Sequence, residues 1–430
     1  MDEPPAATAS ANGTDQLLNG PGPASQVSIK EMVTAFHAVR AALADLFALL
    51  GADPNKTRES AAILGLNRGL AWRLSRVVRA SDPAGAISEV PGPQSMARLL
   101  GVCRERGLPK SQIERAASVF EQFERAVASC TGDRKTLAML VANQRGDAAQ
   151  GEQERARRRL YEGAAGVWGA QAQTRFVTVF VYPSRENPAM LDAAHITGFV
   201  GFRRLSDRSW PLSYEAVHGA DGTARRLAKI PLDSTGSTEG QLQLIKDFCE
   251  PREPDIRVRE TGDYKRFELG AGPVGNQSLS TVVFGSLLPG IYPRYSKEPD
   301  TVGFMVLLQT PIERVVFDLF LHRDLHETTP PRAQLIDRLT YPYANREADF
   351  DEQSLPLSEQ AVPLAGGFGG ALCPHMAFYP RMLSMVTERI GAPIDAFVGS
   401  RFEMTYPPVA TILSRRFDLR PPPGGASGSA

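Results

Sequence analysis

The chain has little of what marks a secreted, membrane-spanning or strongly charged protein. Its 430 residues include four cysteines, Cys103, Cys130, Cys249 and Cys373, which lie far apart and form no CxxC pair. This spacing fits reduced thiols better than a disulfide framework. No stretch approaches the ~18 apolar residues that would span a bilayer. Lys plus Arg and Asp plus Glu number 48 each, so the net charge indicates neither a polyanionic nor a polycationic partner.

Both ends of the chain lack large apolar side chains. Residues 1–27 and 421–430 are rich in Pro, Ala, Gly and Ser, and they cannot bury enough apolar surface to offset the entropy lost on ordering. We expect both to be disordered tails. The acidic start differs from the basic and then apolar pattern of a signal peptide, so a cytoplasmic and bacterial protein is expected.

The first part of the chain has the periodicity of helices. From Ser28 onward, apolar residues recur at spacings of three and four up to Leu50, and similar signals continue to about Asn143. Phe120 and Phe123 share one face of a second long helix. That face is expected to be core rather than a dimer interface. The pattern predicts a helical domain over 28–146, followed by a linker or exposed helix over 147–172.

The remainder of the chain is rich in β-branched and aromatic runs that Gly and Pro interrupt. We expect a mixed α+β domain over 173–420 with a mostly antiparallel sheet, used for effector sensing or oligomerisation. The predicted strands are 175–182, 281–284, 302–309, 315–321 and 397–406. The predicted helices are 239–249, 332–339 and 380–390.

Positive charge is concentrated in the helical part. Residues 28–146 hold 17 Lys and Arg against 11 Asp and Glu. Between Lys56 and Ala80 there are six bases and one acid, Glu59. A dense basic face is typical of a phosphate-binding surface, and it is also typical of a solvated helical hairpin with no partner.

Residues 57–76 resemble the helix-turn-helix of bacterial transcription regulators. Ala61 stands where two helices approach closely, Gly65 stands at the turn, and Asn67 can cap the second helix. Leu64, Leu66 and Leu74 fall at inward apolar positions. Ser60 and Ala71 depart from the pattern, because the family usually has larger apolar residues there.

The resemblance implies that the second helix enters the major groove of double-stranded DNA. The chain is therefore expected to be a sequence-specific transcription regulator, working as a homodimer with a possible small-molecule effector and without a cofactor or resident metal. The side chains expected to contact DNA are Lys56, Arg58, Asn67, Arg68, Trp72, Arg73, Arg76 and Arg79.

The alternative is an enzyme with its site in the C-terminal domain and a helical assembly domain. His322 and His326 have a spacing that metal ligands can use, and Cys373 lies two residues from His375. Either pair would suit a metal-dependent or cysteine-dependent hydrolase. The glycines of 270–275 match GxGxxG, but a strand follows them, so a hairpin loop is expected.

Aromatic side chains in or beside loops of the C-terminal part could also form a small-molecule pocket, although most of them are expected to be core. They are Tyr182, Trp210, Tyr214, Tyr292, Tyr295, Tyr341, Tyr343 and Phe368.

Overall fold

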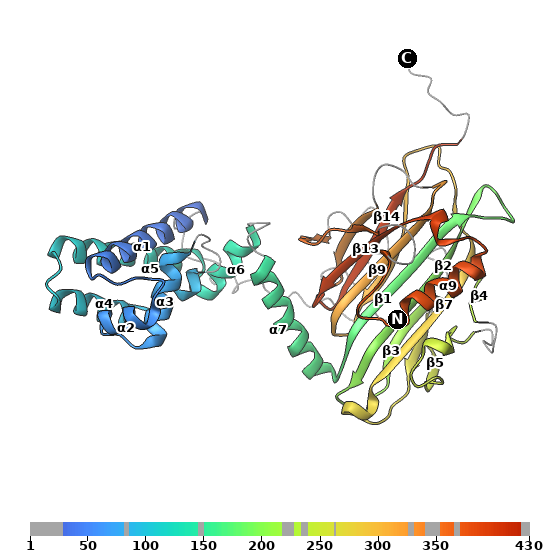
Figure 1. Cartoon of the computed structure of the whole chain (residues 1–430), viewed down its shortest axis with the longest axis horizontal. Helices are drawn as coiled ribbons and strands as arrows, with labels where there is room; N and C mark the ends of the chain where they lie inside the picture. The colour runs from blue at the N-terminus through green and yellow to red at the C-terminus, as the bar shows by residue number, and fades with distance from the viewer. Residues whose placement is uncertain are drawn as a thin grey trace, which may run out of the picture. The chain divides into compact units, whose positions relative to one another are not determined.

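The computed structural model describes most of the chain, and it divides into two compact units, Met1–Gln153 and Glu154–Ala430. The described residues are 29–80, 86–144, 150–216, 228–233, 240–261, 264–325, 331–339, 353–364 and 370–422. The predicted tails lie almost wholly outside them. The chain combines α and β structure, with most helices in the N-terminal part and a β-rich region after it, as predicted (Figure 1).

The first unit is a set of helices around one apolar core. The long helices α1 and α5 pack against each other, and α3 packs on α1. Phe36, Phe47 and Phe123 are fully buried in this core, and Phe120 is buried beside them. The bounds are α1 Ile29–Leu49, α2 Thr57–Leu64, α3 Arg68–Arg79, α4 Pro93–Glu105, α5 Lys110–Cys130 and α6 Arg134–Gln144.

A tight turn joins α2 to α3. Gly65 has φ of 61°, a left-handed conformation that glycine adopts at least cost. Asn67 caps α3, because its side-chain oxygen accepts a hydrogen bond from the Leu70 amide at 2.8 Å. Ala71 is fully buried at the helix contact, and Ser60 donates to the Asp53 carbonyl at 2.5 Å. Both departures from the sequence pattern are therefore accommodated by the packing.

Helix α1 is the one described helix that is long and apolar enough to cross a membrane by length and composition, over Lys30–Leu49. Its apolar stripe lies in the helical core, where Met32, Phe36 and Leu43 are buried. The same periodicity that predicted the helix thus places it against its neighbours.

The second unit is a β-sandwich. Its larger sheet has the order β12-β13-β9-β1-β2-β7-β4, and a four-stranded sheet has the order β11-β10-β14-β8. A third sheet has three strands, in the order β3-β6-β5. The strand pairs are antiparallel except β1 with β9. The bounds are β1 Ala170–Pro183, β2 Met190–Arg204, β3 Trp210–Ala216, β4 Ile230–Pro231, β5 Ile256–Thr261, β6 Tyr264–Leu269, β7 Ser280–Pro293, β8 Thr301–Leu308, β9 Ile312–His322, β10 Arg332–Asp337, β11 Ser354–Leu355, β12 Val362–Leu364, β13 Phe397–Thr405 and β14 Thr411–Asp418.

The two faces of the large sheet have different coverings. Helix α9, Tyr379–Ile390, packs on one face, against Phe176 and Phe180 (Figure 1). The other face packs on the four-stranded sheet, and Val177 and Phe317 share one core cluster with Phe304 of β8. Because side chains alternate along a strand, β1 and β2 are buried on both sides and read as continuous apolar runs.

The segment predicted as a linker or exposed helix forms helix α7, Gln150–Trp168. Within the second unit, Arg157 of this helix pairs with Glu359 at 2.5 Å, and Glu154 accepts from Thr405 at 3.1 Å. Glu154 and Arg157 therefore attach this helix to the sandwich.

Two predicted helices are wrong. Residues 332–337 form strand β10, where Leu335 pairs with Leu413 of β14. In the described part of the second segment, 240–249, the helical residues are Lys246–Phe248, a single 3-10 turn. The Ile245 amide donates to the Val283 carbonyl of β7 at 2.9 Å. In both places backbone pairing with a sheet prevails over residues that favour helix by intrinsic propensity.

Candidate functional site

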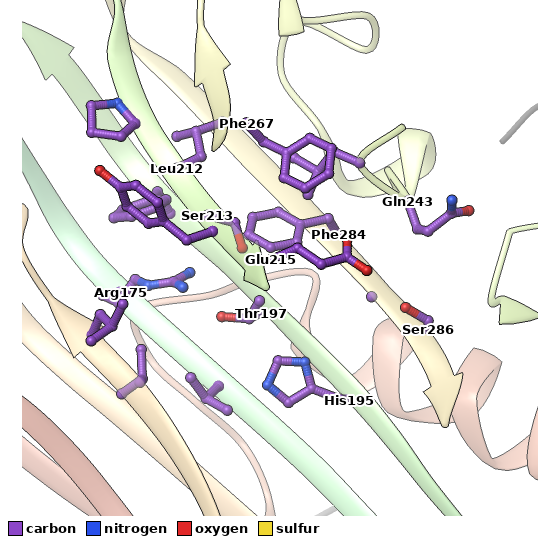
Figure 2. A pocket seen from close by; sticks show the side chains of 18 of the residues that line it. Arg175, His195, Thr197, Leu212, Ser213, Glu215, Gln243, Phe267, Phe284 and Ser286 are labelled. Atoms are coloured by element: carbon purple, nitrogen blue, oxygen red, sulfur yellow. The ribbon is translucent and has the colours of Figure 1, made fainter. Parts of the chain in front are cut away.

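A cavity of about 340 Å³ opens within the second unit. Its floor is the face of the large sheet opposite α9, and its other walls come from β3, β6 and β8. Figure 2 shows Arg175, Thr197 and His195 on the floor strands, with Leu212, Ser213 and Phe267 across from them. This volume lies at the small end of the ~300–1,000 Å³ range of small-molecule sites.

Strand register assembles the floor. Arg175 of β1 pairs with Phe199 of β2, and Thr197 of β2 pairs with Phe284 of β7. His195 of β2 pairs with Ser286 of β7, two residues further along the strands and on the same face. Because alternate residues of a strand point to one side, these side chains line the cavity while their neighbours face α9.

Arg175 is a buried cation in this floor. Its side chain sits 4.3 Å above the Phe199 ring, measured from the guanidinium carbon to the ring centroid. One guanidinium nitrogen donates to the Gly198 carbonyl at 3.1 Å, and its buried Nε has no hydrogen-bond partner among the described residues. Burial lowers the pKa of Arg175 to about 9.

His195 is neutral at physiological pH. Burial lowers the pKa of its imidazole to about 4, and the positive charges of Arg175 and Lys229 act in the same direction. Its ring stacks on Phe304, with centroids 6.3 Å apart. The cavity therefore has one buried fixed cation and an imidazole that burial and the cation keep unprotonated.

The rim of the cavity carries an ion pair. Lys229 contacts Glu215 of β3 at 3.0 Å, and both side chains are about one-third exposed (34% and 36%). Nearby, Trp210 donates to the Thr310 hydroxyl at 2.9 Å. Glu215 is thus neutralised by Lys229, while Arg175 lies deeper in the site.

Aromatic rings dominate the interior. Phe199, Phe267, Phe284 and Phe304 line it, together with Tyr214 at the exposed edge. Rings with a few polar groups are typical of sites for small amphipathic molecules.

Arg401 is a second buried arginine of this fold, and it forms a buried ion pair. Asp318 of β9 is fully buried and accepts two hydrogen bonds from Arg401 of β13, at 2.8 and 2.7 Å. Tyr379 of α9 donates to the same carboxylate and shares a hydrogen bond with Thr178 at 2.9 Å. The Asp318 carboxylate raises the pKa of Arg401, and burial with that carboxylate raises the pKa of Tyr379. This network fastens α9 to the sheet.

The side chains predicted to contact DNA lie on α2, α3 and the segment before them. Asn67 is used as the cap of α3, and Arg76 pairs with Glu89 at 2.9 Å while lying 5.0 Å above the Trp72 ring. Lys56 pairs with Glu59 at 3.2 Å, and Arg79 donates to the Ser75 carbonyl at 3.3 Å. The exposed members of the predicted set are Lys56, Arg58, Asn67, Arg68, Trp72, Arg73 and Arg79. Their contact with DNA, and the homodimer, stay predictions from the sequence.

The residues of the enzymatic alternative do not come together as a nucleophile and base. Burial raises the pKa of the Cys373 thiol, the opposite of what a thiolate nucleophile needs. His375 lies 3.6 Å from Glu403, and His322 lies 3.6 Å from Asp324. His326 falls outside the described residues. Within the described ranges, no group of three or more His, Cys, Asp or Glu side chains is placed to hold a metal ion.

The glycine motif and the loop aromatics have mixed outcomes. Residues 270–275 connect β6 to the 3-10 turn Gly275–Ser278, so the expected loop is observed and no phosphate-binding helix follows. Of the aromatics, Tyr214 lines the cavity, while Tyr341, Tyr343 and Phe368 lie outside the described part of the chain.

Sequence reasoning missed Arg175, His195 and Thr197. A charged side chain inside an otherwise apolar strand, as in RFVTVFVY, is the one local signal that could have indicated Arg175. Nothing local marks His195, because its role depends on the β1–β2–β7 pairing.

Comparisons with known proteins returned little. No family model matches the chain, and no curated protein matches it. Among solved structures, it is similar to a Legionella pneumophila protein provisionally described as nutrient-binding, with 9% identity, a TM-score of 0.28, and coverage of 58% of this chain and 67% of that one.

This finding corrects the predicted function. The sequence indicated a DNA-binding transcription regulator, but the comparison returned a protein described as nutrient-binding and no helix-turn-helix regulator. The likeness is too low to say what this chain binds, so the ligand has to be argued from the cavity itself.

Proposed function

We propose that the second unit binds a small amphipathic organic molecule in the cavity of the sandwich. The observation that supports this is the cavity itself: about 340 Å³, floored by β1, β2 and β7 and walled by aromatic rings. The pocket is concave, opens to solvent, and is lined by aromatic rings with a few polar groups, which is the usual form of a small-molecule site. Polar groups that converge on it, Arg175 and Thr197 among them, would orient a ligand.

Filling the cavity with a larger side chain tests this proposal directly. Ser213 of β3 faces the interior (Figure 2), so Ser213→Trp would occupy the ligand's space. We expect the full-length chain to bind at least one of octanoate and 1-octanol with 1:1 stoichiometry in calorimetry, and Ser213→Trp to bind neither. Ser111→Trp, at an exposed position of α5, is the matched control and keeps the affinity. Absence of binding of both probes to the unmodified chain would refute the proposal.

We also propose that α2 and α3 form a helix-turn-helix-like unit in the architectural sense. The left-handed Gly65, the Asn67 cap and the buried Ala61 and Leu74 support it. In this proposal the turn holds the two helices at a fixed angle and stabilises the helical core.

A further inference from the structure

We infer that the ligand of the cavity is a monoanionic carboxylate whose head group pairs with Arg175 and whose apolar part lies among the phenylalanine rings. This inference rests on the proposed function, and it adds the charge and the orientation of the ligand. Each step follows from groups that line the site.

The first step is the unpaired charge of Arg175. The side chain is 7% exposed, yet no carboxylate is within hydrogen-bonding distance of it among the described residues. Arg401, in contrast, is buried against Asp318 with two hydrogen bonds. A buried charge without a counter-ion is costly, and natural proteins normally pair it. Arg415 is also buried without a carboxylate, but it donates to the Phe317 carbonyl and the Ser400 hydroxyl. Arg175 has the Gly198 carbonyl as its one described hydrogen-bond acceptor and lines the cavity, so a partner for it can come from there.

The second step is the charge balance of the walls. Arg175 and Lys229 are the cationic side chains of the described lining, and Glu215 is its carboxylate. Because Glu215 pairs with Lys229 at 3.0 Å, one positive charge remains, on Arg175. A single negative charge on the ligand would neutralise it. A dianionic phosphate ester would leave one negative charge buried without a partner.

The third step is geometry. The guanidinium is held in place by the Phe199 ring at 4.3 Å and the Phe284 ring at 5.8 Å. A guanidinium presents its N–H groups in a planar fork that matches a carboxylate. With these two rings near it and a hydrogen bond to the Gly198 carbonyl, Arg175 is already oriented before the ligand arrives, so little side-chain entropy is lost on binding.

The fourth step is the environment of the ligand's other end. Phe267 and Leu212 are buried on the side of the cavity across from the floor, and Phe304 of β8 lines the cavity as well. They offer an apolar enclosure with no unpaired cation. An alkyl or aryl group therefore fits there, with its carboxylate toward Arg175.

The test compares four probes that share one alkyl chain: octanoate, 1-octanol, octylamine and octyl phosphate. Calorimetry at pH 7.5 with the full-length chain should give octanoate an affinity about ten to one hundred times that of 1-octanol, the gain typical of a charge-assisted hydrogen-bonded pair. Octyl phosphate should bind more weakly than octanoate, and octylamine not at all.

The variants separate the head group from the cavity. Arg175→Met should reduce the octanoate affinity to that of 1-octanol and leave the 1-octanol affinity unchanged. Arg208→Met, an exposed arginine between β2 and β3, is the control and should keep both affinities. The melting temperature of ligand-free Arg175→Met should equal or exceed that of the unmodified chain, because an unpaired buried charge has been removed.

The outcomes distinguish the two proposals. Equal affinities for octanoate and 1-octanol, or octanoate binding that survives Arg175→Met, would overturn the carboxylate inference while the cavity remains a binding site. Tighter binding of octyl phosphate than of octanoate would replace the monoanion by a phosphate. Failure of both octanoate and 1-octanol to bind would remove the proposed function together with the inference. The comparison of octanoate with 1-octanol on the unmodified chain decides the matter even where a variant does not fold.

Discussion

At the scale of single residues, Arg175 and Arg401 show how context decides what an arginine does. Both are buried in the large sheet of one sandwich, but Arg401 has the Asp318 carboxylate as a partner. Among the described residues, Arg175 has a backbone carbonyl as its hydrogen-bond acceptor and no carboxylate. The first stabilises the packing of α9, and the second leaves a positive charge facing a cavity. Residue type alone does not separate these roles. The difference lies in which side chain the neighbouring strand places beside each arginine.

His195 gives a prediction on pH. Its folded-state pKa of about 4 is below the ordinary value of 6.5, so the unfolded chain binds the proton more readily. The contribution to stability is complete above pH 6.5 and is lost as the pH falls toward 4. Between pH 7 and pH 5 we expect a loss of about 2 kcal/mol from this residue, measured by urea unfolding.

The comparison with His195→Gln isolates this effect from other titrating groups. That variant keeps a polar side chain but has no proton to gain, so its stability should fall less over the same interval. The charged groups near the imidazole are Arg175 and Lys229. A parallel loss of stability in both proteins would contradict the assignment.

At the scale of elements, Gly65 provides a test of the turn between α2 and α3. A Cβ at Gly65 would meet nothing within 4 Å, so Gly65→Ala creates no clash, and its cost comes from the φ of 61° alone. We expect a destabilisation of about 1–2 kcal/mol in urea unfolding.

Gly101 is the matched control in the same unit. It lies inside α4, where an added Cβ would also meet nothing within 4 Å and the backbone has no left-handed φ. Gly101→Ala should therefore stabilise the unit by about 0.5–1 kcal/mol. Changes of the same sign in the two variants would argue against a turn conformation at Gly65.

At the scale of the whole molecule, two compact units predict two unfolding transitions in calorimetry. Octanoate should raise the melting temperature of one transition, that of the sandwich. Phe36→Ala, which opens a cavity in the fully buried helical core, should lower the other by roughly 10–20 °C, in keeping with a cost of about 3–5 kcal/mol. One cooperative transition that responds to both changes would contradict independent units.

Much of this architecture could be predicted from the sequence. The period of three to four gave α1 and α5, and the β-branched runs gave β1, β8, β9 and β13, because burial of alternating or helical faces leaves a strong pattern. The strand β10 was not predicted. Arg332–Leu335 has the local pattern of a helix, and its strand conformation depends on pairing with β14. The order of helices first and strands after them could therefore be predicted from the sequence, and the edges of the sheets could not.

The sequence by itself determined the helical and β-rich halves, the buried face of α1, the Asn67 cap and the basic surface of α2 and α3. Only the tertiary structure decided where a ligand could bind. Arg175, His195, Thr197 and Phe284 are up to 109 positions apart in the chain, and they meet because β1, β2 and β7 pair in one register. Local pattern encodes which side of an element is buried, whereas strand pairing, which is long-range, encodes which side chains share a cavity and which charge is left without a partner.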